Sequence, residues 1–403
     1  MTPALIFDDA APALGVLSDL RPIFDVRTGC LTTLQRFDRA LARPIAAAVV
    51  PDCLADIARE STDLSINQPL PADDLLLLNG RCVLPPDDLN ELASNQAIVE
   101  PESGNLVAAR LSRADAQAYL DTATLPSSVA TRPSPAACLL RRPWDVIRFR
   151  DEAIRRDLAS LLQSTTSPRP SGVLTTGDHA IQIHPTATVF PSVFLDATHG
   201  PIVIDQHAAV RPGAIVVGPA SLGAHSVILE HALIKSNTAI GPVCKVAGEV
   251  GSTIFQSHSN KGHTGHLGDA WIGQWVNLGA GTTNSNLLNT YSEVKAAVDP
   301  DSPREKTGLT FFGCLLGDHV KTAIGTRLMT GTVAGTGAMI AATAPPPTAV
   351  RRFAWLTDTG EKRYQLDRFF QAAERMMRRR EKTLTEPMRQ RLTELHNATP
   401  GKA

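Results

Sequence analysis

An aliphatic residue recurs at every sixth position through the middle of the chain. A helix places apolar residues about every 3.6 positions and a strand places them every two, so neither element produces this spacing. A period of six is typical of a parallel β-helix, in which three hexads of about 18 residues form one triangular coil around an apolar core. Eight consecutive matches disfavour the alternative, a β-sandwich with a chance spacing. The series is Ile204, Val210, Val216, Leu222, Ile228, Ile234, Ile240 and Val246.

The full extent of the pattern predicts a β-helix over residues 181–345, after a linker at 166–180. An aromatic content of 5%, with 28 glycines and 29 prolines, suits such a turn-rich repeat. Two segments, 258–266 and 286–309, interrupt the register, and insertions in repeat proteins map to loops that often form the binding face. Further members of the series are Ile183, Val189, Ile272 and Leu278, then more loosely Leu316, Leu328 and Ile340.

The two ends of the chain predict other folds. Residues 1–165 alternate strand patterns with helix candidates at 31–42, 113–120 and 144–162, which indicates an α/β domain. Residues 346–403 carry an apolar stripe at helical spacing and are expected to form a helical tail. The predicted fold class is therefore an α/β domain followed by an all-β parallel β-helix with a C-terminal helix.

Composition narrows the classes of function. The net charge is −1, so no broad basic field is present to attract nucleic acid or anionic lipid. No run of 18 apolar residues occurs, and the first residues make a poor signal peptide, so we expect a cytoplasmic protein without a membrane span. The cysteines show no CxxC spacing, which favours reduced thiols over disulfides or a zinc site. They are Cys30, Cys53, Cys82, Cys138, Cys244 and Cys314.

The densest polar cluster lies between positions 258 and 295. His263 and His266 precede a hexad, and a histidine near neutral pKa can take a proton from an attacking amine. The asparagines that follow can orient a sugar, and Lys295 can meet a phosphate. The small residues 279–281 let backbone N–H groups approach an oxyanion. Each histidine alone is interpreted as a surface or stacking residue. Its grouping with asparagines and Lys295 favours a catalytic site.

This cluster has the pattern HxxxLGDxxIGxxVNLGAGTxxxN, which resembles the acetyltransferase half of the bifunctional N-acetylglucosamine-1-phosphate uridyltransferase / glucosamine-1-phosphate acetyltransferase family and its archaeal relatives. LGDHVKTAIGTRLMTG resembles the next coil of those proteins. RPIFDVRTGCLT, the Trp144-Asp145 helix start, GPVCKVAGEVGSTIF and NSNLLNTYSEVK extend the resemblance over nearly the full length, in particular to a sugar nucleotidyltransferase group of the family.

The resemblance implies a left-handed β-helix, a homotrimer with active sites between neighbouring prisms, and acetyl-CoA as cosubstrate. It makes His263 the general base that deprotonates the amine of a glucosamine-1-phosphate-like acceptor. The other candidates are His266 and Asn277 for catalysis, then Asn286, Lys295 and Arg211 for the substrate, and Ala280, Gly281 and Ala342 for acetyl-CoA.

Three departures from the family concern the phosphate clamp. The family usually has tyrosine at the position of His266, and lysines at the positions of Ser292 and Gly251. The general base of the family is retained, but fewer phosphate-binding side chains are present. The identity of the acceptor sugar therefore stays open.

The N-terminal domain lacks the family's glycine-rich phosphate loop, roughly GxGxRLxPxxxxxPK, and has FDDAAPALGVLSDLRP instead. Carboxylates there could hold Mg²⁺ and arginines a phosphate. Mg²⁺ is expected only if this domain is active, and the alternative is that these side chains cap and bridge the fold. The candidates for nucleotide binding are Asp8, Asp9, Arg21, Asp25 and Arg27.

The leading hypothesis is acetyl-CoA-dependent N-acyltransfer to an amino-sugar phosphate in UDP-N-acetylglucosamine biosynthesis, with a possible nucleotidyltransferase activity in the N-terminal domain. One alternative makes sugar-1-phosphate nucleotidyl transfer the main activity, and another is a non-catalytic assembly protein that binds a nucleotide sugar. A γ-class carbonic anhydrase, with zinc on His258, His263 and His266, is disfavoured because NLGAGT and NSNL belong to the acyltransferases. All four need only small-molecule ligands.

Overall fold

The computed structural model describes residues 2–11, 14–162 and 170–399. The chain forms two compact units, Met1–Val26 with Leu31–Arg142, and Arg27–Cys30 with Pro143–Ala403. The expected boundary after residue 165 therefore differs from the observed division after Arg142. The segment at 144–162 forms α5 (Asp145–Arg148) and α6 (Arg150–Leu161), and both belong to the second unit.

The first unit is built on a seven-stranded mixed sheet of order β3-β2-β1-β4-β6-β5-β7. Strands β1 to β4 run parallel, β6 is antiparallel to β4 and β5, and β7 is parallel to β5. The strands are β1 (Ala4–Phe7), β2 (Ile45–Val49), β3 (Ser65–Ile66), β4 (Asp74–Asn79), β5 (Gln96–Val99), β6 (Leu106–Ser112) and β7 (Ala130–Pro133).

Both faces of this sheet are covered, which explains why β1 is apolar at every position. Ile6 packs in one cluster with Phe37 of α2 (Thr33–Ala40) and Ala58 of α3 (Asp52–Ser61). Phe7 packs in the other cluster, with Tyr119 of α4 (Arg113–Thr122). The unit is thus a helix–sheet–helix sandwich and confirms the α/β prediction. Its shorter helical pieces are α1 (Gly15–Ser18), η2 (Ile23–Asp25) and η3 (Leu89–Glu91).

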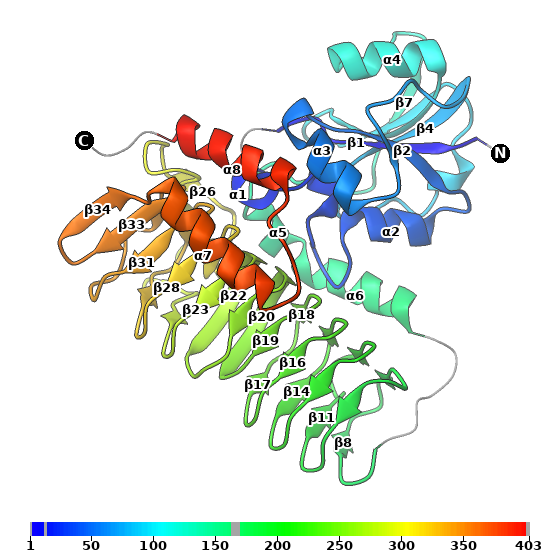
Figure 1. Ribbon diagram of the computed structural model, residues 1–403. Helices are drawn as coiled ribbons and strands as arrows, with labels where there is room; N and C mark the ends of the chain where they lie inside the picture. Colours follow the sequence, from blue (N-terminus) through cyan, green and yellow to red (C-terminus); the bar gives the residue numbers. More distant parts are fainter. Residues whose placement is uncertain (1, 12–13, 163–169, 400–403) are drawn as a thin grey trace. The chain divides into compact units, whose positions relative to one another are not determined.

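The second unit is a parallel β-helix, whose strands stack in three rows (Figure 1). The first row contains β9 (Ile181–Ile183), β12 (Ile202–Ile204), β15 (Ala220–Leu222), β18 (Thr238–Ile240), β27 (Cys314–Leu316), β30 (Thr332–Ala334) and β32 (Ala349–Val350). The third row contains β8 (Leu174–Thr176), β11 (Phe194–Asp196), β14 (Ile215–Val217), β17 (Leu233–Ile234), β24 (Thr283–Asn284) and β29 (Arg327–Leu328).

The second row contains β10 (Thr188–Val189), β13 (Ala209–Val210), β16 (Val227–Ile228), β19 (Lys245–Val246), β21 (Asn260–Lys261), β23 (Asn277–Leu278), β28 (Lys321–Thr322), β31 (Met339–Ala341) and β33 (Ala354–Thr357). Two long strands, β20 (Glu249–Ser257) and β22 (His266–Gln274), bend so that each serves the third row and then the first.

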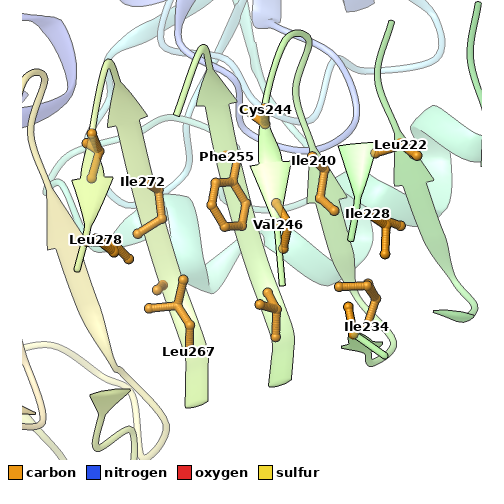
Figure 2. Close-up of a cluster of buried hydrophobic side chains, with 14 of the residues drawn as sticks. Leu222, Ile228, Ile234, Ile240, Cys244, Val246, Phe255, Leu267, Ile272 and Leu278 are labelled. Atoms are coloured by element: carbon orange, nitrogen blue, oxygen red, sulfur yellow. The ribbon is translucent and has the colours of Figure 1, made fainter. Parts of the chain in front are cut away.

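The core of the β-helix consists of the residues that the hexad pattern selected. Ile204 lies opposite Leu222, and Leu222 lies opposite Ile240, which makes each coil 18 residues long. All eight members of the series are at most 3% exposed, and Figure 2 shows five of them projecting into the prism. The strand pairings therefore confirm the β-helix, while its left-handed sense rests on the resemblance.

The β-helix extends beyond both expected limits. β8 lies inside the range expected to be a linker, whose residues 166–169 lie outside the described part of the chain. Strands β32 and β33, followed by antiparallel β34 (Gly360–Arg363), occupy the start of the expected helical tail. The tail then forms α7 (Leu366–Arg378) and α8 (Glu386–Ala398). An insertion after β24 carries the hairpin of β25 (Lys295–Ala296) and β26 (Glu305–Lys306).

Among the described residues, no helix combines the length and the apolar character that crossing a membrane requires.

Candidate active site

His263 lies on the turn between β21 and β22, at the corner of the prism between the second and third rows. Its imidazole is exposed, and the described residues give it no hydrogen-bond partner. The next residue, Thr264, accepts a hydrogen bond at its carbonyl from the N–H of Gly281, at 3.1 Å. The turn that carries His263 therefore lies directly against residues 279–282 of the following coil.

The three residues predicted to bind acetyl-CoA follow this same corner. The Ala280 carbonyl accepts from the Gly325 N–H at 2.7 Å, whereas the Ala280 N–H has no acceptor in the described part of the chain. In the next coil Ala323 donates its N–H to the Ile340 carbonyl at 2.8 Å, so Ala342 follows on the same corner. The structure thus brings Ala280, Gly281 and Ala342 into line with His263.

Lys261 supports the turn of His263 from inside the β-helix. It pairs in register with Val246, and its side chain is 2% exposed. Its ammonium donates to the carbonyls of Ala247 and His263, both at 3.0 Å, and burial lowers its pKa to about 8. Lys261 could not be identified from its residue type, because lysine is ordinarily found at solvent-exposed positions.

His266 belongs to a second polar group, on the outer face of the third row. It pairs in register with Glu249, whose carboxylate lies 3.4 Å from its Nδ1. Lys235 donates to the same carboxylate at 2.7 Å and holds the pKa of Glu249 below its usual range. Gly251 and Gly268 lie directly beneath these side chains, since the atoms nearest to a Cβ on each glycine would belong to Lys235 and His266 respectively.

Asn286 approaches Gly268 from the end of β24. Its Nδ2 is the next closest atom to a Cβ on Gly268, after His266 Nε2, so the two predicted site residues face the same space. The amide donates to Asp269 at 2.7 Å, and Asp269 accepts from Arg150 at 2.8 Å. Lys235, Glu249, Asp269 and Arg150 were missed in the sequence, although one-coil spacing back from His266 points to Glu249.

Asn277 lies on the outer face of the second row, on the other side of the His263 corner. It pairs in register with Asn260, whose side-chain amide donates to it at 2.8 Å. Lys295 is exposed on β25 of the insertion, and within the described part of the chain its side chain makes no hydrogen bond or ion pair with the groups above. Arg211 pairs with Glu230 at 2.8 Å and covers the Phe190 ring, three coils earlier than His263, so the structure does not bring it into this site.

In the first unit, Asp8 and Asp9 lie at the carboxyl end of β1 and line a cavity of about 450 Å³. Asp8 accepts the N–H groups of Ala10 and Ile23, and its burial raises its pKa. Asp9 receives Nε and Nη2 of Arg81, the former at 2.8 Å, which neutralises its charge. Both carboxylates therefore have hydrogen-bond partners within the first unit.

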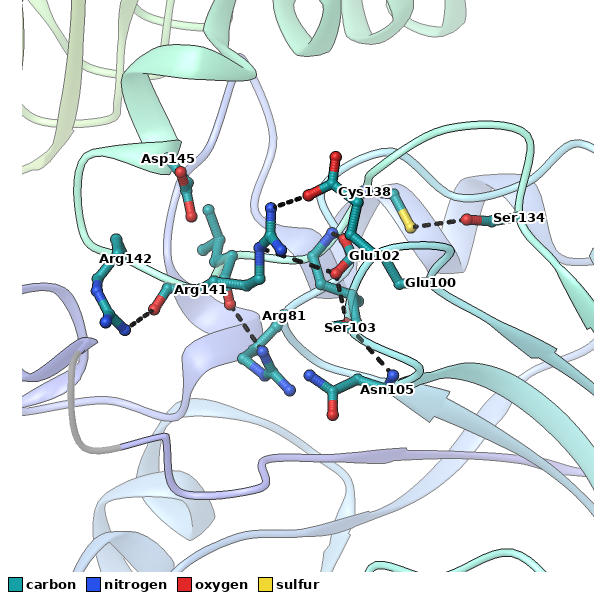
Figure 3. Close-up of polar contacts among 12 residues, drawn as sticks. Arg81, Glu100, Glu102, Ser103, Asn105, Ser134, Cys138, Arg141, Arg142 and Asp145 are labelled. Atoms are coloured by element: carbon teal, nitrogen blue, oxygen red, sulfur yellow. Dashed lines mark hydrogen bonds and ion pairs between the residues drawn. The ribbon is translucent and has the colours of Figure 1, made fainter. Parts of the chain in front are cut away.

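Beside the lining residues Val99 and Asn105, the buried carboxylate of Glu100 accepts from the N–H groups of Cys138 and Leu139 and from the Ser103 hydroxyl (Figure 3). Ser103 in turn accepts the N–H of Asn105, a residue of the cavity lining.

The remaining nucleotide candidates divide between the two units. Burial raises the pKa of Asp25 to about 6, against the opposing effects of Ser61 and Arg21. Arg27 belongs to the second unit, where its N–H donates to the Gln256 side chain at 2.7 Å and its carbonyl accepts from Trp271. The hydrogen-bond partners of Arg27 therefore lie in the second unit, whereas the predicted carboxylates belong to the first.

The described residues contain no group of three histidine, cysteine or acidic side chains that could hold a metal ion. The His258 ring packs against Trp275 in a tilted arrangement, with ring centroids 4.5 Å apart, at the corner between the first and second rows. It therefore lies on a different corner from His263, and the three histidines of the carbonic anhydrase alternative do not converge within the chain.

Comparisons with known proteins agree with the resemblance seen in the sequence. Residues 4–166 match the family model described as sugar nucleotidyl transferase. The bifunctional protein GlmU of a Nostoc species is 28% identical over 181 residues, covering 39% of each chain. A bifunctional sugar-1-phosphate nucleotidylyltransferase/acetyltransferase of Sulfurisphaera tokodaii is 29% identical over 147 residues, covering 35% of each. The matches thus span about two fifths of these relatives.

Among solved structures, the UDP-N-acetylglucosamine acyltransferase of Francisella novicida matches 54% of this chain and 90% of its own, at 12% identity and a TM-score of 0.19.

Proposed function

We propose that the β-helix transfers an acetyl group from acetyl-CoA to the amine of an amino-sugar phosphate, with His263 as general base. The amine nitrogen attacks the thioester carbonyl and forms the amide bond. The imidazole takes the amine proton, and the carbon–sulfur bond breaks to release the CoA thiolate. The Ala280 N–H, which has no other acceptor in the described chain, would donate to the developing oxyanion.

The observation that carries this proposal is the contact between the Thr264 carbonyl and the Gly281 N–H. It fixes an exposed histidine beside an unpaired backbone amide, which are the two groups that acyl transfer to an amine needs. The Sulfurisphaera tokodaii relative, whose name includes acetyltransferase, adds support.

The surface beside Gly251 and Gly268 is proposed to bind the acceptor sugar phosphate. Lys235 offers a cation beside Gly251, where the family has a lysine, and His266 and Asn286 supply hydrogen bonds. Lys295, on the neighbouring insertion, is retained as a candidate for the phosphate. Homotrimer assembly and a cytoplasmic location belong to the same proposal, and light scattering of the purified chain tests the first.

The test is release of free CoA thiol from acetyl-CoA with glucosamine-1-phosphate and a panel of other amino sugars. We expect His263→Ala to lower kcat by about 10²–10⁴-fold, the usual contribution of a general base. His231→Ala is the matched control, because His231 is exposed on the same corner in an earlier coil. Full activity of the His263→Ala variant would show that His263 is not the general base. No CoA release by the wild type with any acceptor of the panel would rule out the proposed acyl transfer.

A second activity is proposed for the first unit, since its residues match a sugar nucleotidyl transferase model and the cavity beside Asp8 and Asp9 lies at the carboxyl ends of parallel strands. Mg²⁺-dependent release of pyrophosphate from a nucleoside triphosphate and a sugar-1-phosphate tests it. Asp8→Asn is expected to reduce the rate, and an absence of pyrophosphate with every nucleotide would leave the unit without this activity.

A further inference from the structure

A pocket of about 550 Å³ lies within the second unit, between the outer face of the second row of strands and α7. The hydrogen-bonded pair Asn260 and Asn277 lines it on the β-helix side, next to Trp275. Arg375 and Arg379 line it on the helix side. A volume of this size matches small-molecule sites, which usually measure about 300–1,000 Å³.

The charge of this lining is one-sided. Five cationic side chains contribute to it, and its residues include no aspartate or glutamate. Arg380 donates to the Val243 carbonyl at 2.9 Å, and Lys321 donates to the His319 carbonyl at 3.3 Å. The described residues place no carboxylate in an ion pair with the other three. The five are Lys245, Lys321, Arg375, Arg379 and Arg380.

Burial shifts the pKa values of two groups in this lining. Burial lowers the pKa of His258 to about 4, and the charges of Lys382 and Arg380 act in the same direction. Burial also lowers the pKa of Lys321 to about 8. Like charges without a counter-charge repel one another. Binding of an anion among these side chains would therefore lower their electrostatic repulsion.

The helical wall of the pocket is firmly placed. Phe369 of α7 contacts His319 and Phe353 of the β-helix edge to face, with ring centroids 5.5 and 5.2 Å apart. Met377 is buried on the same side, and Arg380 is tied to the Val243 carbonyl. The guanidinium groups are therefore presented by an anchored element, which lowers the entropy cost of binding a ligand.

We propose that this pocket binds an organic diphosphate, the nucleoside diphosphate moiety that CoA and nucleotide sugars share. Arginine pairs with phosphate oxygens in bidentate fashion and lysine as a point charge, and two adjacent phosphates suit five cations better than one does. The amides of Asn260 and Asn277 offer hydrogen bonds to the attached nucleoside or sugar. This proposal concerns binding alone, so it stands or falls separately from acyl transfer.

The test is isothermal titration of the full chain with inorganic pyrophosphate, CoA and a uridine diphosphate sugar, at fixed ionic strength. We expect Arg375→Gln combined with Arg379→Gln to weaken binding about tenfold or more, because charge-assisted hydrogen bonds to phosphate are lost. Arg378→Gln is the matched control, since Arg378 is an exposed arginine of the same helix that does not line the pocket.

The ligand that loses affinity in the double variant identifies the source of the diphosphate, CoA or the nucleotide sugar, and either supports the proposal. Unchanged affinity for all three probes in the double variant overturns it, as does an equal loss in Arg378→Gln. Absence of binding by the wild type to every probe also overturns it. Thermal melting of each variant without ligand checks that the fold is retained.

Discussion

Lys261 is a charged residue in the apolar core of a β-helix, and its protonation should be visible in stability. Its pKa is lowered to about 8 in the folded chain, whereas an unfolded lysine titrates near 10.4. The unfolded state therefore binds more protons between these values, so the wild type should gain stability as the pH rises from about 8 to 10. Lys261→Met should flatten this rise when melting temperatures are compared across that range.

The comparison is internally controlled, because Lys321 also has a pKa of about 8 and contributes the same slope to both proteins. Parallel melting curves for wild type and Lys261→Met at every pH would contradict a buried, titrating ammonium.

Sequence patterns reach the residue scale only in part. The pattern from His263 to Asn286 selected residues that the structure places around one corner of the prism and beside Gly268. The six-residue period could not identify Lys261 as an inward-facing residue. Val246 and Lys261 are paired but only 15 residues apart, so this coil is shorter than 18 residues and the period no longer shows which side chains point inward.

At the scale of the strand, substitutions at inward-facing and outward-facing positions of neighbouring coils should differ sharply in their effect on the free energy of unfolding. Ile234 of β17 is 1% exposed in the core, while Ile215 of β14, opposite Leu233 on the adjacent coil, is 38% exposed. We expect Ile234→Ala to cost about 3 kcal/mol through lost burial and a cavity. Ile215→Ala, the same substitution on an outward position, should cost under about 1 kcal/mol.

Thermal or urea unfolding of the two variants measures the difference. Equal losses at the two positions would mean that the six-residue register does not describe the core.

Elements were predictable where a period was strict. The hexads identified the repeating strands of the β-helix, and α2 and α4 overlap the helix candidates at 31–42 and 113–120. The assignment of α5 and α6 to the second unit was not predictable, because it depends on packing such as the Arg150–Asp269 ion pair, whose partners lie 119 residues apart. The basic pocket escaped for the same reason, since α7 completes it from far along the chain.

At the scale of the whole molecule, the two units have separate apolar cores and should unfold in separate steps. Leu76 lies in the sheet core of the first unit and is fully buried, whereas Ile234 lies in the β-helix core. We expect calorimetry to show two transitions, since a compact unit with its own core unfolds cooperatively. Leu76→Ala should lower one midpoint by about 6–12 °C and leave the other within about 2 °C, and Ile234→Ala should do the reverse.

The control for this experiment is Ile215→Ala, which should leave both midpoints nearly unchanged because its side chain is already partly hydrated. Two outcomes would mean that the units unfold as one cooperative block. The first is a single calorimetric transition, and the second is an equal shift of both midpoints by either core substitution. Diphosphate bound in the basic pocket should raise only the transition that Ile234→Ala lowers, because a ligand stabilises the unit that holds its site. The same calorimetric scan thus assigns the pocket to its unit.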